Sequence, residues 1–466
     1  MADSGSNPHV VLLPSPGIGH LIPFVELAKR LALHHNLSVT IITFSNFTSH
    51  IHHAILSALP AGVSAVSLPP VPLDDLPATT DGISRISVMI SRSIPSVREA
   101  LRHIRDTTPR VAAFIIDLFC GDTLPIAEEL RFPQFIFFTS SLFCLSMFLH
   151  LPTLHDSPEK ANLLRLPGCL PLQATLISDM SMSDHGLSYM LHHSRNHDRV
   201  DGIMVNSFEA MEGGAAGFLR DRGEGKPPVV PVGPLVNCDA DSAGSDRDES
   251  CIEWLDRQPD RSVLFVAFGS WGSLSLEQAG ELAVGLEMSG QRFLWVIRKP
   301  GDDEGGDYFS INHADDLLGF LPQGFLERTK EKGMVVPFWV PQAKILAHAA
   351  VGGFLSHCGW NSCLESIVNG VPMIAWPLNA EQPMNALMLT EMKVALRAGG
   401  SSADGKVRKE EIAGVVRKLI EGEEGKDARR RMREVQETAV KAVSSGESSD
   451  VALAVMVNSW KSRADN

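Results

Sequence analysis

The chain has 466 residues, which is too many for one compact core and enough for two domains. Its formal net charge of −14, from 41 Lys and Arg against 55 Asp and Glu, argues against nucleic acid or an anionic membrane as a partner, because both require a basic surface. Its seven cysteines include no C-x-x-C pair, so neither a zinc cluster nor a disulfide framework is expected. The polar N-terminal residues lack the basic start of a secretory signal. We therefore expect a cytoplasmic globular protein.

Short apolar runs alternate with helical periodicity through the first half of the chain. Strands that alternate with helices form parallel sheets with helices on both faces, so this rhythm predicts an α/β domain over residues 1–236. The expected strands are residues 9–13, 37–44, 110–118 and 134–138, and the expected helices between them include 21–34 and 123–130.

One stretch, residues 132–154, carries no Asp, Glu, Lys or Arg and is long enough to span a bilayer. However, it contains Pro133 and three consecutive hydroxyl residues at 139–141. These residues divide it into a short strand and a helix capped by a hydroxyl side chain. We expect a buried strand and helix, and no stable membrane insertion.

The alternation stops near residue 236 and resumes further on. Residues 237–250 are acidic, contain Ser and Gly and have no apolar periodicity, which indicates a linker. A second α/β domain is then expected over residues 251–450. Its charged segment 409–434 alternates in sign at helical spacing, as solvated helical faces do. The expected strands of this domain are 262–270, 293–297, 335–338, 353–356 and 373–376.

The first loop of interest, PSPGIGH at residues 14–20, contains a Gly-x-Gly after the first strand. Ile22 stands where a dinucleotide fingerprint has its third glycine, and the second strand ends in Thr43 and Phe44 without the acid expected for a ribose, which argues against nicotinamide binding. The loop presents His20 at a helix start. His20 could cap or pack against the helix, or act as a general base oriented by a carboxylate.

A carboxylate for His20 could come from the end of the strand at 110–118. Asp117 lies in an otherwise apolar run, where an acid is costly unless it is paired. Asp122 follows shortly after and could instead cap the next helix. We therefore take Asp117 as the candidate partner of His20.

Residues 354–365, FLSHCGWNSCLE, are predicted to run from a strand through a turn into a helix that begins near Asn361. A helix N-terminus suits a phosphate, and His357 and Ser362 would add donors. Alternatively, the spacing from Ser362 to Glu365 fits a capping box. Cys358 is a weak candidate nucleophile, because neighbouring residues on a strand point to opposite faces.

Residues 339–382 resemble the 44-residue signature box of plant family 1 UDP-sugar glycosyltransferases. The PSPG at 14–17, GHLIP at 19–23, WPL at 376–378 and GEEGK at 422–426 are similar to the subgroup that glucosylates phenols such as hydroquinone, monolignols and chlorinated phenols, in the manner of arbutin synthase. The box is carried by WVPQ at 339–342, Leu346, His348, Phe354, HCGWNS at 357–362, Glu365, Gly370, Pro372, Pro377 and EQ at 381–382.

The resemblance implies a GT-B fold, in which two Rossmann-like domains with parallel sheets face across a cleft. It also implies that residues 451–466 form a C-terminal helix returning to the first domain. The implied reaction is inverting transfer of glucose from UDP-glucose to a small phenolic or aromatic hydroxyl, without a metal or other cofactor. We expect a monomer whose partners are the acceptor and the UDP-sugar.

The resemblance also implies a role for each matched residue. His20 corresponds to the general base and Asp117 to its orienting partner. Core packing is an equal alternative for each of the candidate acceptor-pocket residues, which are Phe119, Ser141, Phe143 and Phe148. The implied donor-binding residues are Trp339, Val340 and Gln342 at the base and ribose, Glu365 at the ribose, Gly19, Ser270, His357, Asn361 and Ser362 around the diphosphate, and Trp360, Glu381 and Gln382 at the sugar, where Gln382 is the form associated with glucose.

The chain departs from the subgroup at Trp271, where glycine is usual, at Asn379, where an aromatic is usual, and after Pro152, where the segment is shorter. These departures bear on the acceptor, for which hydroquinone, monolignol, chlorophenol and indoxyl types are all candidates. Three alternatives stay open: a catalytically silent UDP-sugar-binding protein, a glucosyltransferase for a flavonoid or other larger acceptor, and a nucleotide-sugar epimerase.

Overall fold

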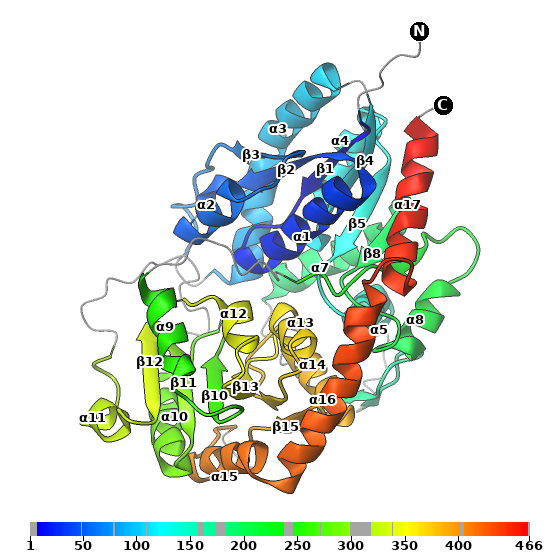
Figure 1. The fold of residues 1–466 in the computed structure, drawn as a ribbon. Helices are drawn as coiled ribbons and strands as arrows, with labels where there is room; N and C mark the ends of the chain where they lie inside the picture. The colour runs from blue at the N-terminus through cyan, green and yellow to red at the C-terminus, as the bar shows by residue number, and fades with distance from the viewer. Residues whose placement is uncertain are drawn as a thin grey trace. The chain divides into compact units, whose positions relative to one another are not determined.

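The chain folds into two compact units, each built on one parallel sheet covered by helices (Figure 1). The first unit comprises Met1–Asn237 and Val440–Asn466, and the second comprises Cys238–Ala439. The structure is a computed structural model, and the residues that it describes are 7–47, 49–77, 80–108, 110–156, 163–173, 183–236, 246–270, 272–298, 318–337, 339–399 and 405–464.

The sheet of the first unit has seven parallel strands in the order β3-β2-β1-β4-β5-β8-β9. The chain adds β2 and β3 on one side of β1 and then returns to place β4 on the other side. This change of direction between β1 and β4 is a topological switch point, where the carboxyl ends of the strands open a site for ligands. The strands are β1 (His9–Leu13), β2 (Ser38–Phe44), β3 (Val63–Leu68), β4 (Val111–Ile116), β5 (Gln134–Phe138), β8 (Gly202–Val205) and β9 (Val229–Pro231).

Helices connect these strands, and a two-stranded antiparallel ladder, β6 (Leu163–Leu164) with β7 (Leu172–Gln173), lies outside the main sheet. The helices of the first unit are α1 (Ile18–His35), η1 (Ser45–Phe47), α2 (His50–Ser57), α3 (Gly82–Thr107), η2 (Leu118–Thr123), α4 (Leu124–Glu129), α5 (Leu142–Asp156), α7 (Asp184–Asn196), η3 (His197–Arg199), α8 (Gly213–Arg220) and α17 (Ser448–Ala464).

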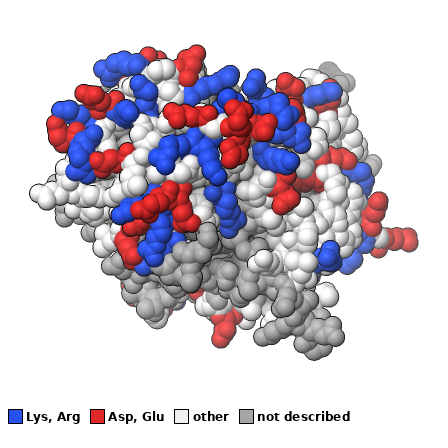
Figure 2. Space-filling model, turned by 90° about the horizontal axis from the view of Figure 1, so that it is seen from below, with Lys and Arg blue, Asp and Glu red and all other residues white. Residues whose placement is uncertain are grey.

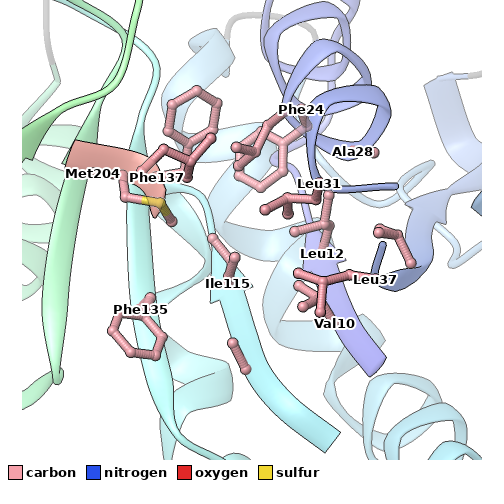
Figure 3. Close-up of a cluster of buried hydrophobic side chains, with 14 of the residues drawn as sticks. Val10, Leu12, Phe24, Ala28, Leu31, Leu37, Ile115, Phe135, Phe137 and Met204 are labelled. Carbon is pink, nitrogen blue, oxygen red and sulfur yellow. The ribbon is translucent and has the colours of Figure 1, made fainter. Parts of the chain in front are cut away.

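The core on one face of this sheet is formed by alternate residues of β1, β4 and β5, because successive side chains of a strand point to opposite faces. Leu12 and Ile115, which are neighbours in the β1–β4 register, pack with Phe24 of α1 (Figure 3). The C-terminal α17 contributes to the same core through Trp460, whose ring centroid lies 5.1 Å from that of Phe135. The last helix of the chain is thus part of the first unit.

The second unit repeats the arrangement with six parallel strands in the order β12-β11-β10-β13-β14-β15. Its switch point lies between β10 and β13. Gly285 of α10 lets α15 approach closely, because a Cβ there would lie 2.7 Å from the Cβ of Ile412. The elements are β10 (Val263–Ala267), β11 (Arg292–Ile297), β12 (Gly333–Pro337), β13 (Val351–Ser356), β14 (Met373–Ala375) and β15 (Ala395–Arg397), with α9 (Asp246–Asp256), α10 (Leu276–Ser289), α11 (Phe325–Thr329), α12 (Gln342–Leu346), α13 (Trp360–Val368), α14 (Gln382–Glu391), α15 (Lys409–Ile420) and α16 (Glu423–Ala442).

The expected α/β fold with two parallel sheets is confirmed, and the uncharged stretch 132–154 forms β5 and α5. Of the helices in the described ranges, none is long and apolar enough to cross a membrane. Two expectations differ from the structure. Residues 246–250 form the first turns of α9 instead of a linker, and the charged segment 409–434 is divided between two helices, α15 and α16. Residues 237–245 of the expected linker lie outside the described residues.

Candidate active site

A group of polar side chains lies at the carboxyl ends of β1, β4 and β5 in the first unit. Asp117 is fully buried, and its Oδ2 lies 3.0 Å from Nδ1 of His20 and 3.3 Å from Oγ1 of Thr139. Its Oδ1 accepts a hydrogen bond of 2.6 Å from the hydroxyl of Ser15. These donors compensate a buried carboxylate that would otherwise be costly. We call these four residues the His20 cluster; sequence reasoning missed Ser15 and Thr139, although each lies within two residues of a strand end.

The turn between β1 and α1 places His20 in this cluster. Gly17 has φ 113°, a conformation that residues with a side chain rarely adopt, and α1 begins at the next residue, so that Gly19 and His20 lie in its first turn. A histidine that donates Nδ1–H to a carboxylate keeps its lone pair on Nε2. The His20 side chain is 21% exposed, and α1 has no side-chain cap. The capping alternative therefore does not describe His20, and its contact with the Asp117 carboxylate goes beyond a packing role.

Asp122, the other carboxylate considered for this region, has a different partner. Its Oδ1 lies 2.8 Å from Nε2 of His192 on α7. The helix that follows, α4, has Thr123 at its N-cap position and no side-chain capping bond. The alternative that Asp122 caps this helix is therefore wrong, and Asp117 alone of the two contacts His20.

Aromatic rings adjoin the His20 imidazole. The Phe119 ring meets it edge-on, with centroids 5.7 Å apart, and stacks on Tyr189 at 6.3 Å. The Tyr189 hydroxyl donates a 2.6 Å hydrogen bond to the carbonyl oxygen of Phe119 and so holds this segment in place. Phe119 is thus the candidate acceptor-pocket residue that lies beside His20.

The other three candidate acceptor-pocket residues have capping or packing roles. The Ser141 hydroxyl accepts the backbone N–H of Cys144 and caps α5. Phe143 and Phe148 are only 3% and 1% exposed, and the Phe148 ring packs against Phe138. The alternative of core packing agrees with the burial of both phenylalanines, and the assignment of all three residues to an acceptor pocket stays a prediction.

Sequence reasoning also missed Glu212, which fixes the start of α5. This buried carboxylate accepts the backbone N–H groups of Leu142 at 3.0 Å and Phe143 at 2.8 Å, together with the hydroxyl of Ser207. Burial raises the pKa of Glu212 above its ordinary value, although these hydrogen bonds oppose the shift. No local signal identifies this role, because the α5 backbone groups that Glu212 binds lie about 70 residues earlier in the chain.

The switch point of the second unit holds His357, which follows β13, and Ser270, which follows β10. The His357 ring is enclosed by two glycines: a Cβ on Gly269 or on Gly359 would lie 2.4 Å from a ring atom. Burial lowers the pKa of His357 to about 4, so the imidazole is neutral at neutral pH and can donate one N–H to an anion. Arg298 donates to the carbonyl oxygen of Ser270 and ties the β10 loop to the end of β11.

The helix after His357 begins within one residue of the predicted position near Asn361. Helix α13 begins at Trp360, a buried residue, and Gly359 is its N-cap without a side-chain capping bond. Ser362 is therefore the third helical residue and does not cap. Its hydroxyl and the Oε2 of Glu365 both accept hydrogen bonds from Gln342 Nε2, at 2.9 and 2.6 Å. The capping-box alternative is wrong, and we call Gln342, Ser362 and Glu365 the Glu365 cluster.

Burial also shifts the ionisation of Glu365. It raises the pKa of this carboxyl to about 7, against a smaller opposing effect of the Gln342 hydrogen bond. Trp339, which lies three residues before Gln342, is 41% exposed, whereas the next residue, Val340, is buried. Asn361 lies in the first turn of α13, beside the cluster in sequence. A buried acid, an exposed indole and a helix N-terminus are what a nucleotide requires for its ribose, base and phosphates.

The start of α14 holds Glu381 and Gln382, two of the three residues expected at the sugar. Glu381 is the N-cap residue of α14. The Gln382 Oε1 accepts the backbone N–H groups of Leu378 at 2.9 Å and Asn379 at 3.0 Å, while its Nε2 donates to Oδ1 of Asn379 at 2.7 Å. Asn379, one of the departures from the family pattern, therefore fixes the orientation of the Gln382 amide. Trp271, another departure, lies outside the described residues, as do 157–162 and 174–182 after Pro152.

The fold and these two sites define a nucleotide-sugar-dependent transferase of the GT-B class. Residues 227–437 match the family model described as UDP-glucoronosyl and UDP-glucosyl transferase, and the chain belongs to this family as a UDP-glycosyltransferase. It is 47% identical to the hydroquinone glucosyltransferase of Rauvolfia serpentina, over 98% of each chain. This relative confirms the resemblance to the hydroquinone glucosyltransferase subgroup.

Two solved structures are similar over nearly the whole chain. One is a UDP-glucosyltransferase from Polygonum tinctorium capable of glucosylating indoxyl, in complex with 3,4-dichloroaniline, with a TM-score of 0.88, 42% identity and coverage of 98% of this chain and 100% of that one. The other is Phytolacca americana UGT2 complexed with UDP-2fluoro-glucose and pterostilbene, with a TM-score of 0.86, 42% identity and coverage of 97% and 100%.

Proposed function

We propose that this UDP-glycosyltransferase transfers glucose from UDP-glucose, with inversion, to a hydroxyl of a small phenolic or aromatic acceptor. The observation that carries the proposal is the 3.0 Å contact between His20 and the buried Asp117 at the switch point of the first unit. The relatives named for hydroquinone and indoxyl favour acceptors of that size. A flavonoid or other larger acceptor is the second candidate, which pterostilbene in the Phytolacca structure favours.

In the proposed mechanism, His20 activates the acceptor. A free phenol has a pKa near ~10, so little phenolate exists at neutral pH and a positioned base is useful. Nε2 of His20 takes the hydroxyl proton while the acceptor oxygen forms its bond to the anomeric carbon. The bond from that carbon to the diphosphate oxygen breaks at the same time, so the anomeric configuration is inverted. Asp117 stabilises the imidazolium that results.

The second unit holds the donor and stabilises the leaving group. Trp339 offers a face on which uracil can stack, and Glu365 accepts hydrogen bonds from the ribose hydroxyls. Negative charge that develops on the diphosphate is stabilised by the N-terminus of α13 together with His357 and Ser362. These donors can stabilise that charge without a metal, and we propose a metal-free reaction. Within the described ranges, no three His, Cys, Asp or Glu side chains form a metal-ligand group.

The function is tested by incubating the protein with UDP-glucose and hydroquinone, indoxyl or a flavonoid, and analysing the products by mass spectrometry and NMR. We expect a β-glucoside and release of UDP, with the highest kcat/KM for a single-ring or indole hydroxyl. UDP binding without any glucoside would support the silent binding protein. Isomerised UDP-sugar without an acceptor would support the epimerase. Either result would contradict the proposal.

The orientation of Gln382 gives a first prediction. Asn379→Ala removes the acceptor of the Gln382 Nε2 hydrogen bond but leaves the two backbone bonds to Oε1. If Gln382 contacts the sugar, we expect KM for UDP-glucose to rise about three- to tenfold, the value of one hydrogen bond, while the affinity for UDP stays the same. Steady-state kinetics and calorimetry measure the two quantities. An equal loss for UDP would show that the loop, and not the sugar contact, is affected.

The raised pKa of Glu365 gives a second prediction. The ribose hydroxyls donate to the ionised carboxylate, so binding favours loss of the proton that Glu365 holds below pH 7. Uridine affinity should therefore rise about tenfold between about pH 6 and about pH 8, and uridine has no group of its own that titrates there. His357, with a pKa of about 4, is neutral throughout this range. Calorimetry on Glu365→Gln should give weaker binding without the pH dependence; the same slope in the variant would contradict the assignment.

A further inference from the structure

A polar cavity lies in the same unit as the Glu365 cluster but at the opposite edge of its sheet. It has a volume of about 200 Å³ and is formed where the chain enters β10, β13 and β14, that is, at the amino ends of these strands. The side of the cavity away from the strands is α16, which presents Arg429, Arg433 and Gln436. The spacing of these three residues places them on one face of the helix. Arg261, directly before β10, completes the group.

The lining of this cavity is basic and contains no acid. Its charged and titratable side chains are Arg261, Arg429, Arg433 and His348, and the last of these lies 3.1 Å from Asp256, which is not part of the lining. Within the described ranges, no Asp or Glu forms an ion pair with any of the three arginines. This is unusual in a chain with a net charge of −14. Basic and acidic side chains are interleaved on the face of the molecule that Figure 2 shows.

Two neighbouring arginines of α16 that do not line the cavity are paired with acids. Arg430 pairs with Asp427 and Glu434 at 3.2 Å, and Arg431 pairs with Glu434 at 2.5 Å. Neither residue is part of the cavity lining, and both have their counter-charges on the same helix. Acidic partners are therefore available on α16, yet the arginines that line the cavity do not use them.

The charges of two of the cavity arginines act on the third, Arg429. Burial, then the charges of Arg261 and Arg433, lower the pKa of Arg429 from its ordinary value. Arg429 has a structural role as well, because it donates a 2.7 Å hydrogen bond to the carbonyl oxygen of Leu419 at the end of α15. Arg261 has φ 55°, a left-handed conformation that is unfavourable for a residue with a side chain. An anion in the cavity would compensate the mutual repulsion of these groups.

We propose that this cavity, which we call the arginine pocket (Arg261, Arg429, Arg433), binds a compact phosphate-type oxyanion at a site separate from that of the UDP-sugar. The planar guanidinium group donates two parallel hydrogen bonds that match the oxygens of a phosphate. The volume is below the range of about 300–1,000 Å³ that drug-sized ligands occupy, so the pocket suits inorganic phosphate or pyrophosphate and not a whole nucleotide.

The test is calorimetric titration of inorganic phosphate and pyrophosphate into protein that is already saturated with UDP, so that the donor site cannot respond. We expect saturable binding that weakens as salt is added. Arg433→Gln and Arg261→Gln should each weaken it about tenfold, since each removes a charge-assisted contact. Arg429 is left unchanged because of its bond to α15. The matched control is Arg431→Gln, which loses the same charge from the same helix and should bind like the wild type.

Three results would overturn the proposal. One is the absence of saturable binding to the UDP-saturated wild type, and another is equal weakening by Arg431→Gln, which would indicate attraction to the general surface only. The third is binding of citrate in preference to both phosphates, which would identify a polycarboxylate site. Circular dichroism of each variant, together with its UDP affinity, shows that the second unit remains folded. A comparison of the affinities for phosphate and for pyrophosphate distinguishes a site for one phosphate group from a site for two.

Discussion

Replacement of His20 by alanine is expected to lower kcat for glucoside formation by about 10²–10⁴-fold, the usual contribution of a general base. UDP affinity should change little, because His20 belongs to the first unit, whereas the proposed donor residues other than Gly19 belong to the second. The His20 side chain packs edge-on against Phe119, so its loss should disturb little beyond the cluster itself. Single-turnover kinetics with UDP-glucose and hydroquinone, together with calorimetric titration of UDP, measure the two effects separately.

The matched control is His192→Ala, which removes an imidazole that is also paired with an aspartate, Asp122, and is more exposed. This variant should retain most of its activity. Near-normal turnover in His20→Ala would show that another group accepts the proton. A loss of UDP affinity equal to the loss of rate would show that the residue supports folding or donor binding instead of catalysis.

Asp117→Asn is expected to lower kcat on the order of 10³-fold, although it only replaces a carboxylate by an amide of nearly the same shape. The amide would present either a donor or a weaker acceptor to Nδ1 of His20, which now lies 3.0 Å from a carboxylate oxygen. If the amide nitrogen faces the ring, the proton moves to Nε2 and the base is lost. If the amide oxygen faces it, the imidazolium loses its stabilising negative charge.

The control for this variant is Asp122→Asn, which neutralises a nearby carboxylate that contacts His192 and not His20. It should leave kcat close to that of the wild type. A pH–rate profile separates orientation from mere structural support: Asp117→Asn should lower the apparent pKa of the catalytic base, because a neighbouring negative charge favours the protonated imidazole. An unshifted profile with lower amplitude would indicate a structural role only.

The strands that the sequence predicts well are those buried within the sheets. The runs at 9–13 and 134–138 coincide with β1 and β5, because a strand that is buried on both faces reads as a continuous apolar segment. The sequence prediction misses β8, a four-residue strand inside the first sheet, although it predicts the edge strand β12. The other strands that it misses, β3, β9 and β15, lie at sheet edges, where one side is unpaired and side chains can be exposed. In β3, for example, most residues are exposed.

The sequence also predicts part of the candidate active site. His20 and Asp117 follow from a loop motif and from an acid in an apolar strand, and the structure brings them together. Ser15 and Thr139 require knowledge of which strands are neighbours, and only the order β1-β4-β5 places their hydroxyls beside Asp117. The capping-box interpretation of Ser362 fails because the spacing alone does not determine at which residue a helix begins.

The most direct measurement is a crystal structure of the protein with a non-reactive UDP-glucose analogue and a phenolic acceptor bound together. We expect the acceptor oxygen within about 2.6–3.2 Å of Nε2 of His20, on the side of the anomeric carbon opposite the diphosphate. An acceptor oxygen bound away from His20, or an imidazole that turns Nε2 away from it while both substrates are in place, would contradict the proposed mechanism.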